Sequence, residues 1–199
     1  MGDAEYPHEG QHEESERRGV GPWEGPLPDG EHWDAELLAE GDYRNVEDKY
    51  RYWKQESIKE DILHRSLGYE VAIENLGHDF NIGSIVRTAN ALGSSKVHIV
   101  GRRRWNRRGA MVTDRYMNVD HHHDVADFVE EVRGRGLSII GIDNLPGSAP
   151  LESATLPRAA VLVFGEEGAG LSEQMLGTCD QVLHISQYGS TRSLNVGHA

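Results

Sequence analysis

From residue 69 onward, short apolar stretches alternate with longer amphipathic ones, and this alternation restricts the possible folds more than any other feature of the sequence. Two parallel strands need a crossover connection, which is usually a helix. The pattern therefore predicts an α/β fold with a mainly parallel sheet and helices on both faces. The expected strands are 70–75, 96–101, 137–142, 159–164 and 181–185, and the expected helices are 82–92, 124–133 and 172–176.

Polar segments follow several of the expected strands. They cover residues 75–81, 143–147, 165–170 and 186–195. In open α/β sheets, ligands bind at the carboxyl ends of the strands. We therefore expect the functional residues to gather at this edge of the sheet.

The helix expected at 82–92 has an apolar stripe at offsets of three and four, formed by Ile82, Ile85, Val86, Ala89 and Leu92. Arg87 lies roughly 160° from the centre of that stripe, at about 100° per residue, so its guanidinium points away from the core. Asn81 is a candidate N-cap, and Gly93 can adopt the left-handed backbone conformation that often ends a helix. Arg87 is either an ordinary solvated charge or a functional group presented to a ligand.

The glycine fingerprint of a dinucleotide-binding domain, G-x-G-x-x-G, is missing. The sequence after the first expected strand reads LGHDFNIG, and GEEGAG at 165–170 has a different spacing. Its two carboxylates would repel a pyrophosphate but can accept hydrogen bonds from a cationic or hydroxyl-bearing ligand. A nicotinamide dehydrogenase is therefore disfavoured, and 165–170 is either a ligand loop or a glycine-rich turn with solvated acids.

The net charge of −13 is unevenly distributed. Residues 1–60 contain 17 acids and 7 bases, whereas residues 61–199 contain 16 and 13. No acidic residue lies between Asp79 and Asp114, where seven Lys and Arg residues occur. Five of them are the arginines of RRRWNRR at 102–108. Guanidinium groups bind phosphates and an indole stacks on an exposed base, so this loop favours a nucleic acid over a solvated face or a protein partner.

The run of Asp120, His121, His122, His123 and Asp124 resembles a metal site only superficially. Neighbouring side chains on one segment rarely converge on an ion, and no distant Cys or His motif has metal-site spacing. We therefore expect partly exposed imidazoles and no metal. Cys179, the single cysteine, has no activating neighbour in the sequence and is interpreted as a small hydrophobic residue rather than a nucleophile.

The composition divides the chain into three parts. Residues 1–32 are rich in Glu, Gly, Pro and His, and are expected to form a disordered acidic leader. Residues 33–66 carry aromatic and aliphatic residues at helical spacing, which predicts a helical extension that packs on the domain or contacts a substrate. Residues 67–199 form the main domain. No apolar run reaches the ~20 residues of a membrane helix, and no signal peptide is evident, so we expect a cytoplasmic protein.

Three blocks of this domain resemble the SpoU (TrmH-like) RNA ribose 2′-O-methyltransferases of the SPOUT superfamily. They are NIGSIVRTANALG at 81–93, LVFGEEGAGL at 162–171 and ISQYGSTRSLNV at 185–196. The resemblance covers about residues 69–199. It implies an α/β fold with a C-terminal trefoil knot, S-adenosylmethionine as methyl donor, an RNA substrate and a homodimer. The third block is similar to relatives that act on a tRNA guanosine.

The resemblance also implies roles for individual residues. The catalytic or substrate-positioning residues would be Asn81, Arg87, Glu167, Ser193 and Asn195. The cofactor pocket would be lined by Gly165, Ile185 and Leu194, to which we add Asp143 and Gly189 from the polar segments at the same edge. The RNA backbone would be held by the loop at 102–108, through Arg102, Arg103, Arg104, Trp105, Arg107 and Arg108.

Arg87 is expected to stabilise the alkoxide that develops on the ribose rather than to act as a base, because an arginine pKa above about 12 leaves almost no neutral form at pH 7. Family members continue beyond the third block into a helix that completes the knot, whereas this sequence stops at Ala199. We therefore expect weak cofactor binding and little turnover. The alternative function is a catalytically impaired RNA-binding protein that keeps the fold.

Overall fold

The computed structural model describes residues 19–75, 81–166, 168–190 and 194–199. The chain divides into two compact units, Met1–Lys54 and Gln55–Ala199. Within the described residues no helix is long and apolar enough to span a membrane.

The first unit is built on one short helix, α1 (Ala35–Glu40). The Asp34 carboxylate caps it by accepting hydrogen bonds from two backbone N–H groups, and the helix stops at Gly41, whose φ is +96°. Residues 19–32, which we expected within a disordered leader, are tied to this helix and its C-terminal turn: the Trp23 N–H donates to Leu38 O, and Val20 pairs with Asp42. Backbone pairing together with packing of aromatic rings supplies the contacts that composition alone did not predict.

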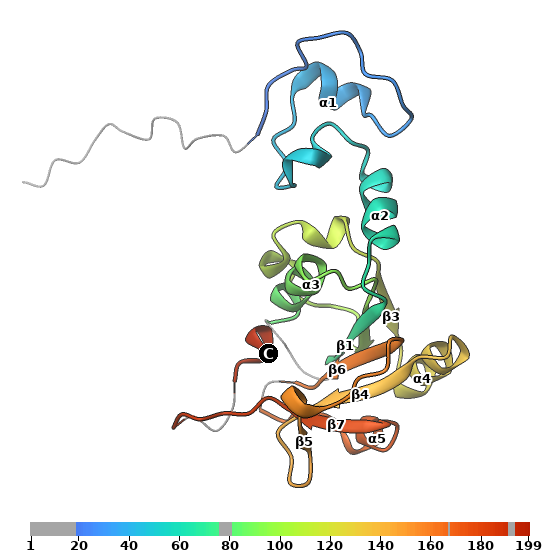
Figure 1. Cartoon of the computed structure of the whole chain (residues 1–199), viewed down its shortest axis with the longest axis vertical. Coiled ribbons are helices and arrows are strands. Elements are labelled where there is room, and N and C mark those ends of the chain that lie inside the picture. Colours follow the sequence, from blue (N-terminus) through green and yellow to red (C-terminus); the bar gives the residue numbers. More distant parts are fainter. Residues whose placement is uncertain (1–18, 76–80, 167, 191–193) are drawn as a thin grey trace, which may run out of the picture. The chain divides into compact units, whose positions relative to one another are not determined.

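The second unit starts with α2 (Gln55–His64) and contains, in its described part, a seven-stranded sheet with the order β3-β2-β1-β6-β4-β7-β5 (Figure 1). Each pair of neighbouring strands is parallel. The strands are β1 (Tyr69–Asn75), β2 (Val97–Gly101), β3 (Val119–His122), β4 (Ser138–Ile142), β5 (Ala149–Pro150), β6 (Ala160–Phe164) and β7 (Gln181–His184).

The predicted α/β architecture is confirmed, and each of the five expected strands is present to within one residue at either end. Two strands were not predicted. β3 has the sequence VDHH, whose polar residues give no apolar signal, and β5 is two residues long and contains a proline. Both lie at the edges of the sheet, where an apolar sequence is not required.

The helices α3 (Ile82–Ala91), α4 (Val125–Gly134) and α5 (Glu173–Leu176) cover both faces of the sheet. Alternate residues of β1 show this division: Val71 and Ile73 pack with α3, whereas Ala72 packs in the cluster that holds α4 and α5. Leu92, which we placed in the apolar stripe of α3, is 62% exposed because the helix has ended before it. Gly93 takes the expected left-handed conformation, with φ +78°.

The strand order places the ends of β4, β6 and β7 side by side. The chain runs outward from β1 to β2 and β3, then returns to the other side, where β6 separates β1 from β4. Such a reversal opens a crevice at the carboxyl ends of the strands. The loops after β2 and β6, which hold the arginine cluster and the glycine motif, both start at this edge.

Candidate functional site

A cavity of about 200 Å³ lies at the carboxyl ends of β4, β6 and β7. Four of the five predicted cofactor residues line it, namely Asp143, Gly165, Ile185 and Leu194. Gly189 is absent from its lining. The remaining lining residues are Ile142, Asn144, Phe164, Glu166, Gly168, Gly170, His184, Gln187, Val196 and Ala199.

The loop after β6 is closed on itself by two backbone hydrogen bonds. The Glu166 N–H donates to Gly170 O (3.1 Å), and the Gly170 N–H donates to Glu166 O (2.9 Å). A Cβ on Gly165 would clash with the carbonyl group of Gly170, so only glycine fits at this position. Gly170 has φ +72°, a conformation that favours glycine. The described residues of this motif, 165–166 and 168–170, therefore form a tightly constrained wall of the pocket.

Two carboxylates hold the far end of this loop. Asp143 Oδ2 accepts a hydrogen bond from the Leu171 N–H (2.8 Å). Glu74, buried at the end of β1, accepts from both the backbone N–H and the hydroxyl of Ser172, each at 2.7 Å. Sequence reasoning missed Glu74, because it lies in an apolar strand and its partner is 98 residues away. Its position inside a buried strand was the only signal that it had a specific partner.

The first and third sequence blocks meet at a pair of asparagines. Asn195 Nδ2 donates to Asn81 Oδ1 (3.2 Å), and the Asn195 side chain also accepts from the Gly197 N–H (2.8 Å). Asn81 precedes α3 but has helical backbone angles and makes no capping hydrogen bond with its side chain, so its predicted capping role is wrong. The amide is turned toward the C-terminal segment instead.

Arg87 is exposed on α3, as its position opposite the apolar stripe indicated. It does not line the 200 Å³ cavity of this chain. The other two predicted catalytic residues, Glu167 and Ser193, lie outside the described residues. The structure therefore brings Asn81 and Asn195 together and leaves Arg87 on the surface.

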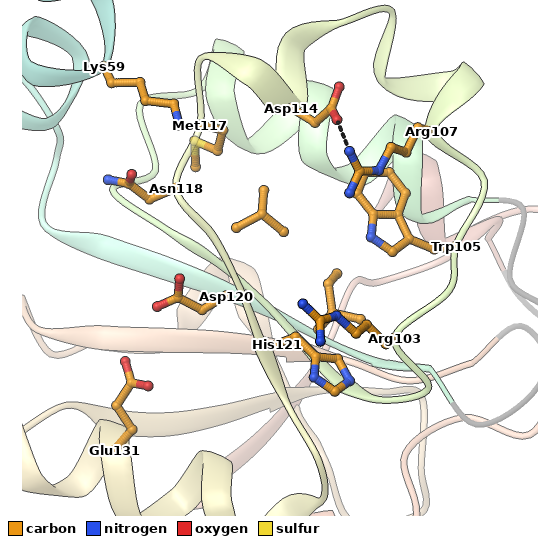
Figure 2. Close-up of a pocket in the computed structure, with 12 residues that line it drawn as sticks. Lys59, Arg103, Trp105, Arg107, Asp114, Met117, Asn118, Asp120, His121 and Glu131 are labelled. Carbon is orange, nitrogen blue, oxygen red and sulfur yellow. Dashed lines mark ion pairs between the residues drawn. The ribbon is translucent and has the colours of Figure 1, made fainter. Parts of the chain in front are cut away.

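The arginine loop at 102–108 follows β2 and borders a second, polar cavity of about 620 Å³ (Figure 2). Arg103, Trp105 and Arg107 line this cavity. The Arg107 guanidinium lies 5.5 Å from the centre of the Trp105 ring and 3.5 Å from the carboxylate of Asp114. The other three predicted RNA-binding arginines, Arg102, Arg104 and Arg108, are exposed.

The start of this loop is fixed from inside the fold. The Asn75 side-chain amide donates to the backbone carbonyls of Arg102 (2.6 Å) and Arg104 (3.1 Å). These bonds fix the backbone of the loop, and the arginine side chains of the loop are exposed. Guanidinium groups in such a position can bind an anionic ligand.

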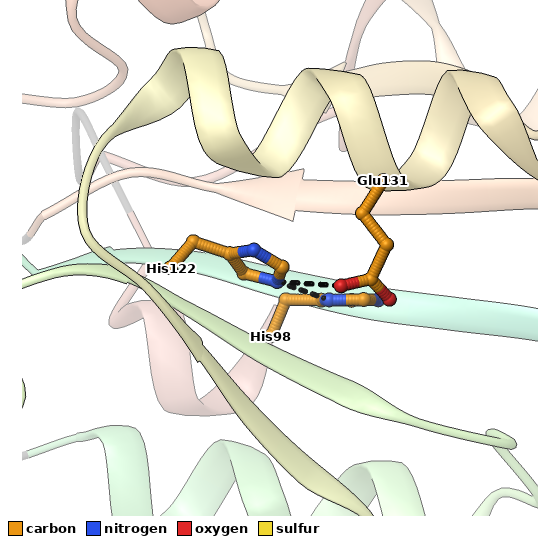
Figure 3. A group of neighbouring side chains, drawn as sticks. All are labelled: His98, His122 and Glu131. Atoms are coloured by element: carbon orange, nitrogen blue, oxygen red, sulfur yellow. Dashed lines mark hydrogen bonds and ion pairs between the residues drawn. The ribbon is translucent and has the colours of Figure 1, made fainter.

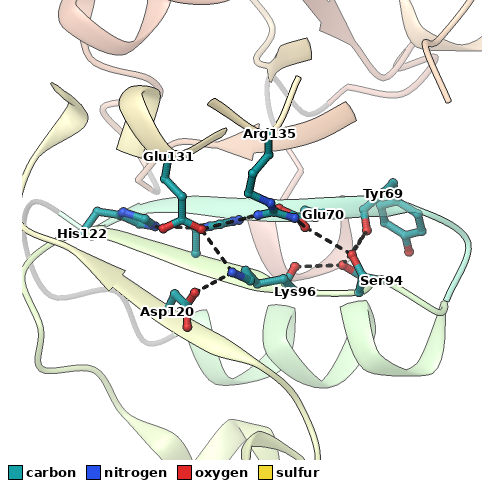
Figure 4. A network of polar contacts seen from close by, with 10 residues as sticks. Tyr69, Glu70, Ser94, Lys96, Asp120, His122, Glu131 and Arg135 are labelled. Atoms are coloured by element: carbon teal, nitrogen blue, oxygen red, sulfur yellow. Dashed lines mark hydrogen bonds and ion pairs between the residues drawn. The ribbon is translucent and has the colours of Figure 1, made fainter. Parts of the chain in front are cut away.

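A polar network extends from the buried side chains of Glu70, His98 and His122 to partly exposed charged groups around them (Figure 4). Glu70 contacts His98 Nε2 (2.8 Å) and accepts from the Arg135 guanidinium (3.0 Å). Burial raises the pKa of Glu70, but the hydrogen bonds from His98 and Arg135 outweigh it and lower this pKa to about 2. Burial, together with the neighbouring His98, lowers the pKa of His122. Sequence reasoning missed this network because its members come from β1, β2, β3 and α4.

The histidine run is only partly as predicted. His123 is exposed, and His121 hydrogen-bonds the carbonyl of Gly101 (2.7 Å). His122 is buried, which corrects the expectation of exposed imidazoles, because strand alternation turns it to the α4 face. Cys179 is half-buried beside the core, where burial raises the pKa of its thiol to about 11, in agreement with the inert role expected for it.

Comparison with known proteins identifies relatives of this architecture. The model of the SpoU rRNA Methylase family matches residues 68–199. The tRNA (guanosine(18)-2′-O)-methyltransferase of Escherichia coli K12 is 27% identical over 145 residues, which are 71% of this chain and 63% of the relative. The chain thus spans less than two thirds of the length of this curated relative.

The solved structures that share the fold include two methyltransferases of the SpoU type. The TrmH/SpoU tRNA modifying enzyme of A. aeolicus superposes with a TM-score of 0.63 at 22% identity, covering 72% of this chain and 75% of the other. The SpoU methyltransferase AviRb of Streptomyces viridochromogenes, in complex with AdoMet, gives 0.61 at 24% identity, covering 70% and 59%. Since the family model covers about two thirds of the sequence, this chain belongs to the SpoU methylase family.

Proposed function

We propose that this chain binds S-adenosylmethionine and transfers its methyl group to a ribose 2′-hydroxyl of RNA. The observation that carries the proposal is the convergence of the sequence blocks 81–93, 162–171 and 185–196, two on one pocket and the third joined to them by the contact between Asn81 and Asn195. In the reaction the C–S bond of the sulfonium breaks with its electrons going to sulfur, while the ribose oxygen bonds the methyl carbon and its proton leaves to water or a phosphate.

The cofactor would occupy the cavity of about 200 Å³. Gly165, Ile185 and Leu194 would contact it largely through backbone and apolar atoms, and the closed glycine loop would fix its position. Asp143 would keep that loop in place through its bond to Leu171. The AdoMet complex of AviRb, a relative in fold, supports this cofactor.

Arg87 would stabilise the developing alkoxide, a contribution of the kind that costs about 10²–10³ in rate when a single donor is removed. Asn81 and Asn195 would position the substrate, and Glu167 and Ser193 are proposed for the same task from their places in the sequence blocks. Because Arg87 is exposed and does not line the pocket of its own chain, the proposal includes a homodimer that brings the two together.

The arginine loop would hold the RNA backbone, with Trp105 stacking on an unpaired base. The E. coli relative acts on guanosine 18 of tRNA, so we favour tRNA as substrate. The trefoil knot and the cytoplasmic location stay predictions. The alternative function is that of an RNA-binding protein with impaired catalysis. In that case the arginine loop would still bind RNA, but Arg87 would have no catalytic role.

The test measures transfer of labelled methyl from S-adenosylmethionine to a pool of tRNA transcripts, together with RNA binding and cofactor titration. We expect label in a 2′-O-methyl nucleotide, and Arg87→Ala should lower the rate at least about a hundredfold while RNA binding is retained. Arg158→Ala, an exposed arginine just before β6, is the matched control. RNA binding by the wild-type chain without any methyl transfer would support the alternative instead.

A further inference from the structure

Two imidazoles and a carboxylate meet between β2, β3 and α4 (Figure 3). They belong to His98, His122 and Glu131, and one potential ligand atom from each lies within 4.8 Å of the other two. His98 and His122 are buried, whereas the Glu131 side chain is 35% exposed. These residues have no role in the proposed methyl transfer.

We propose that His98, His122 and Glu131 bind a divalent transition-metal ion, with Zn²⁺ as the best match to the ligand types. Imidazole nitrogens and a carboxylate oxygen are common zinc ligands, at about 2.0–2.2 Å from the ion. Two such ligands in a tetrahedral site lie roughly 3.3 Å apart. The His98 Nδ1 to His122 Nε2 distance is 2.8 Å and the His122 Nε2 to Glu131 Oε2 distance is 3.9 Å, so shifts of about half an ångström admit the ion.

The surroundings already select the correct tautomer of His98. The Glu70 carboxylate, 2.8 Å from Nε2, is acceptor-only, so Nε2 carries the proton and the lone pair of Nδ1 faces the site. That lone pair accepts from the His122 Nε2–H, so binding of the ion would move the His122 proton to Nδ1 of the same ring or release it to solvent. Arg135 in turn holds Glu70 (3.0 Å). A carboxylate that orients a histidine from outside the ligand set is a regular feature of metal sites.

Glu131 divides its two oxygens between neighbours. Oε1 pairs with Lys96 (3.1 Å), while Oε2 faces His122. Lys96 also pairs with Asp120 (2.6 Å), and Arg135 contacts Glu131 Oε1 (3.4 Å). The carboxylates of Asp120, Glu131 and Glu70 offset these two neighbouring cations, which would otherwise oppose a metal ion. Asp120 and Glu131 both line the 620 Å³ cavity, which provides a path by which a hydrated ion reaches the site.

The ion would connect three elements that surround the arginine loop. His98 lies in β2, which leads into the loop, and His122 lies in β3, which follows the segment 102–118 that contains the loop. Coordination would therefore clamp both ends of segment 102–118 and tie them to α4. The proposal concerns structure and not methyl transfer, so it stands or falls independently of the proposed function.

The experiment uses the full chain after treatment with a chelator. It is titrated with Zn²⁺ by calorimetry and with Co²⁺ by visible absorption, which reports tetrahedral coordination. We expect one equivalent per chain, the visible bands of tetrahedral Co²⁺ and a raised Tm with Zn²⁺. His122→Gln and Glu131→Gln should each weaken binding at least about tenfold. His121→Gln and His123→Gln, which change the neighbouring imidazoles of the same run, should bind as wild type.

Glu131→Gln carries the test if His122→Gln does not fold, because Glu131 is partly exposed and the change is isosteric. Binding of much less than one equivalent of metal, or unchanged binding by both ligand variants, would show that the two imidazoles form only a hydrogen-bonded pair. Loss of binding in His123→Gln would assign the ion to the exposed group of His123, Asp124 and Asp127 and would also overturn the proposal.

Discussion

The two halves of the central sheet, β4, β6 and β7 in one and β2 and β3 in the other, are bordered by cavities with different linings. At the ends of β4, β6 and β7, the pocket is lined mainly by glycine, apolar side chains and backbone. Beside β2 and β3, the larger cavity is lined mainly by charged and polar side chains, and the arginine loop extends from it. Both groups of strands belong to the same parallel sheet, and they differ in the loops into which the strands lead.

The difference has a physical consequence for tolerance to change. A pocket built from close backbone contacts fails when any atom is added, because packed backbone cannot yield without moving a whole loop. On a charged surface, each arginine that is replaced removes one phosphate contact, so the affinity for nucleic acid falls gradually. A substitution on one side of the sheet should therefore change the ligand affinity of that side and leave the affinity of the other side unchanged.

The largest effect is expected for Gly165→Ala. The new Cβ would clash with Gly170, so the closed loop must shift and the pocket wall with it. We expect about a hundredfold loss of S-adenosylmethionine affinity, measured by calorimetry, with RNA binding little changed. Gly134→Ala, where a Cβ meets nothing within 4 Å, is the control. Wild-type cofactor affinity in Gly165→Ala would mean that the ligand lies elsewhere.

Glu74→Gln tests whether the buried Glu74 carboxylate stabilises the glycine loop that lines the pocket, through its hydrogen bonds to Ser172. The amide nitrogen would face a donor of Ser172, leaving at least one buried group without its partner. The expected loss in the free energy of unfolding is about 2 kcal/mol, measured by urea denaturation, with a smaller loss of cofactor affinity. Ser172→Ala removes the hydroxyl bond to Glu74 together with the cap that this hydroxyl provides for α5, so we expect a loss of similar size. Unchanged stability in Glu74→Gln would contradict this account.

On the charged side, the double variant Arg103→Gln, Arg107→Gln should weaken tRNA binding about tenfold at about 0.1 M salt. The slope of log K against log salt should fall by about one for each phosphate that the variant no longer binds. Cofactor affinity should stay the same, which is the sharpest test of the division between the two sides. An equal effect from two arginine substitutions away from the loop, or an unchanged salt slope here, would show that the loop does not bind phosphate.

The smallest effect is expected from Asp180→Asn, just before β7 and so at the edge of the sheet opposite the pocket. Asp180 accepts hydrogen bonds from Arg133 (2.7 Å) and the Ile139 N–H (2.8 Å), and the bond from Arg133 lowers its pKa below the ordinary 3.8. Since the pKa is lowered on folding, the stabilisation is present above pH 3.8 and is lost as the pH falls through the lower folded value.

We expect Asp180→Asn to cost about 0.5 kcal/mol at pH 7, a small value because the ion pair is exposed. The difference from wild type should fade in urea denaturation at about pH 3. Asp127→Asn, an exposed acid on α4, serves as the control. A constant difference across this pH range would mean that charge is not the cause.

Much of the fold was predictable because its signals are local. The stripe from Ile82 to Ala89 specified α3 and the outward position of Arg87, and apolar runs specified the five strands that carry the core. β3 was missed because VDHH lacks an apolar pattern, and the pairing of residues 19–32 with α1 was missed because it depends on rings that are far apart in the sequence.

The sequence by itself determined the α/β class, the strand-end position of the glycine loop and the arginine loop, since helix periodicity, strand length and charge are properties of short segments. Only the tertiary structure brought Glu74 to Ser172, Asn81 to Asn195 and His98 to His122. These contacts depend on the order and register of the strands. Packing of the whole core determines both, so they cannot be predicted from the sequence of any single segment.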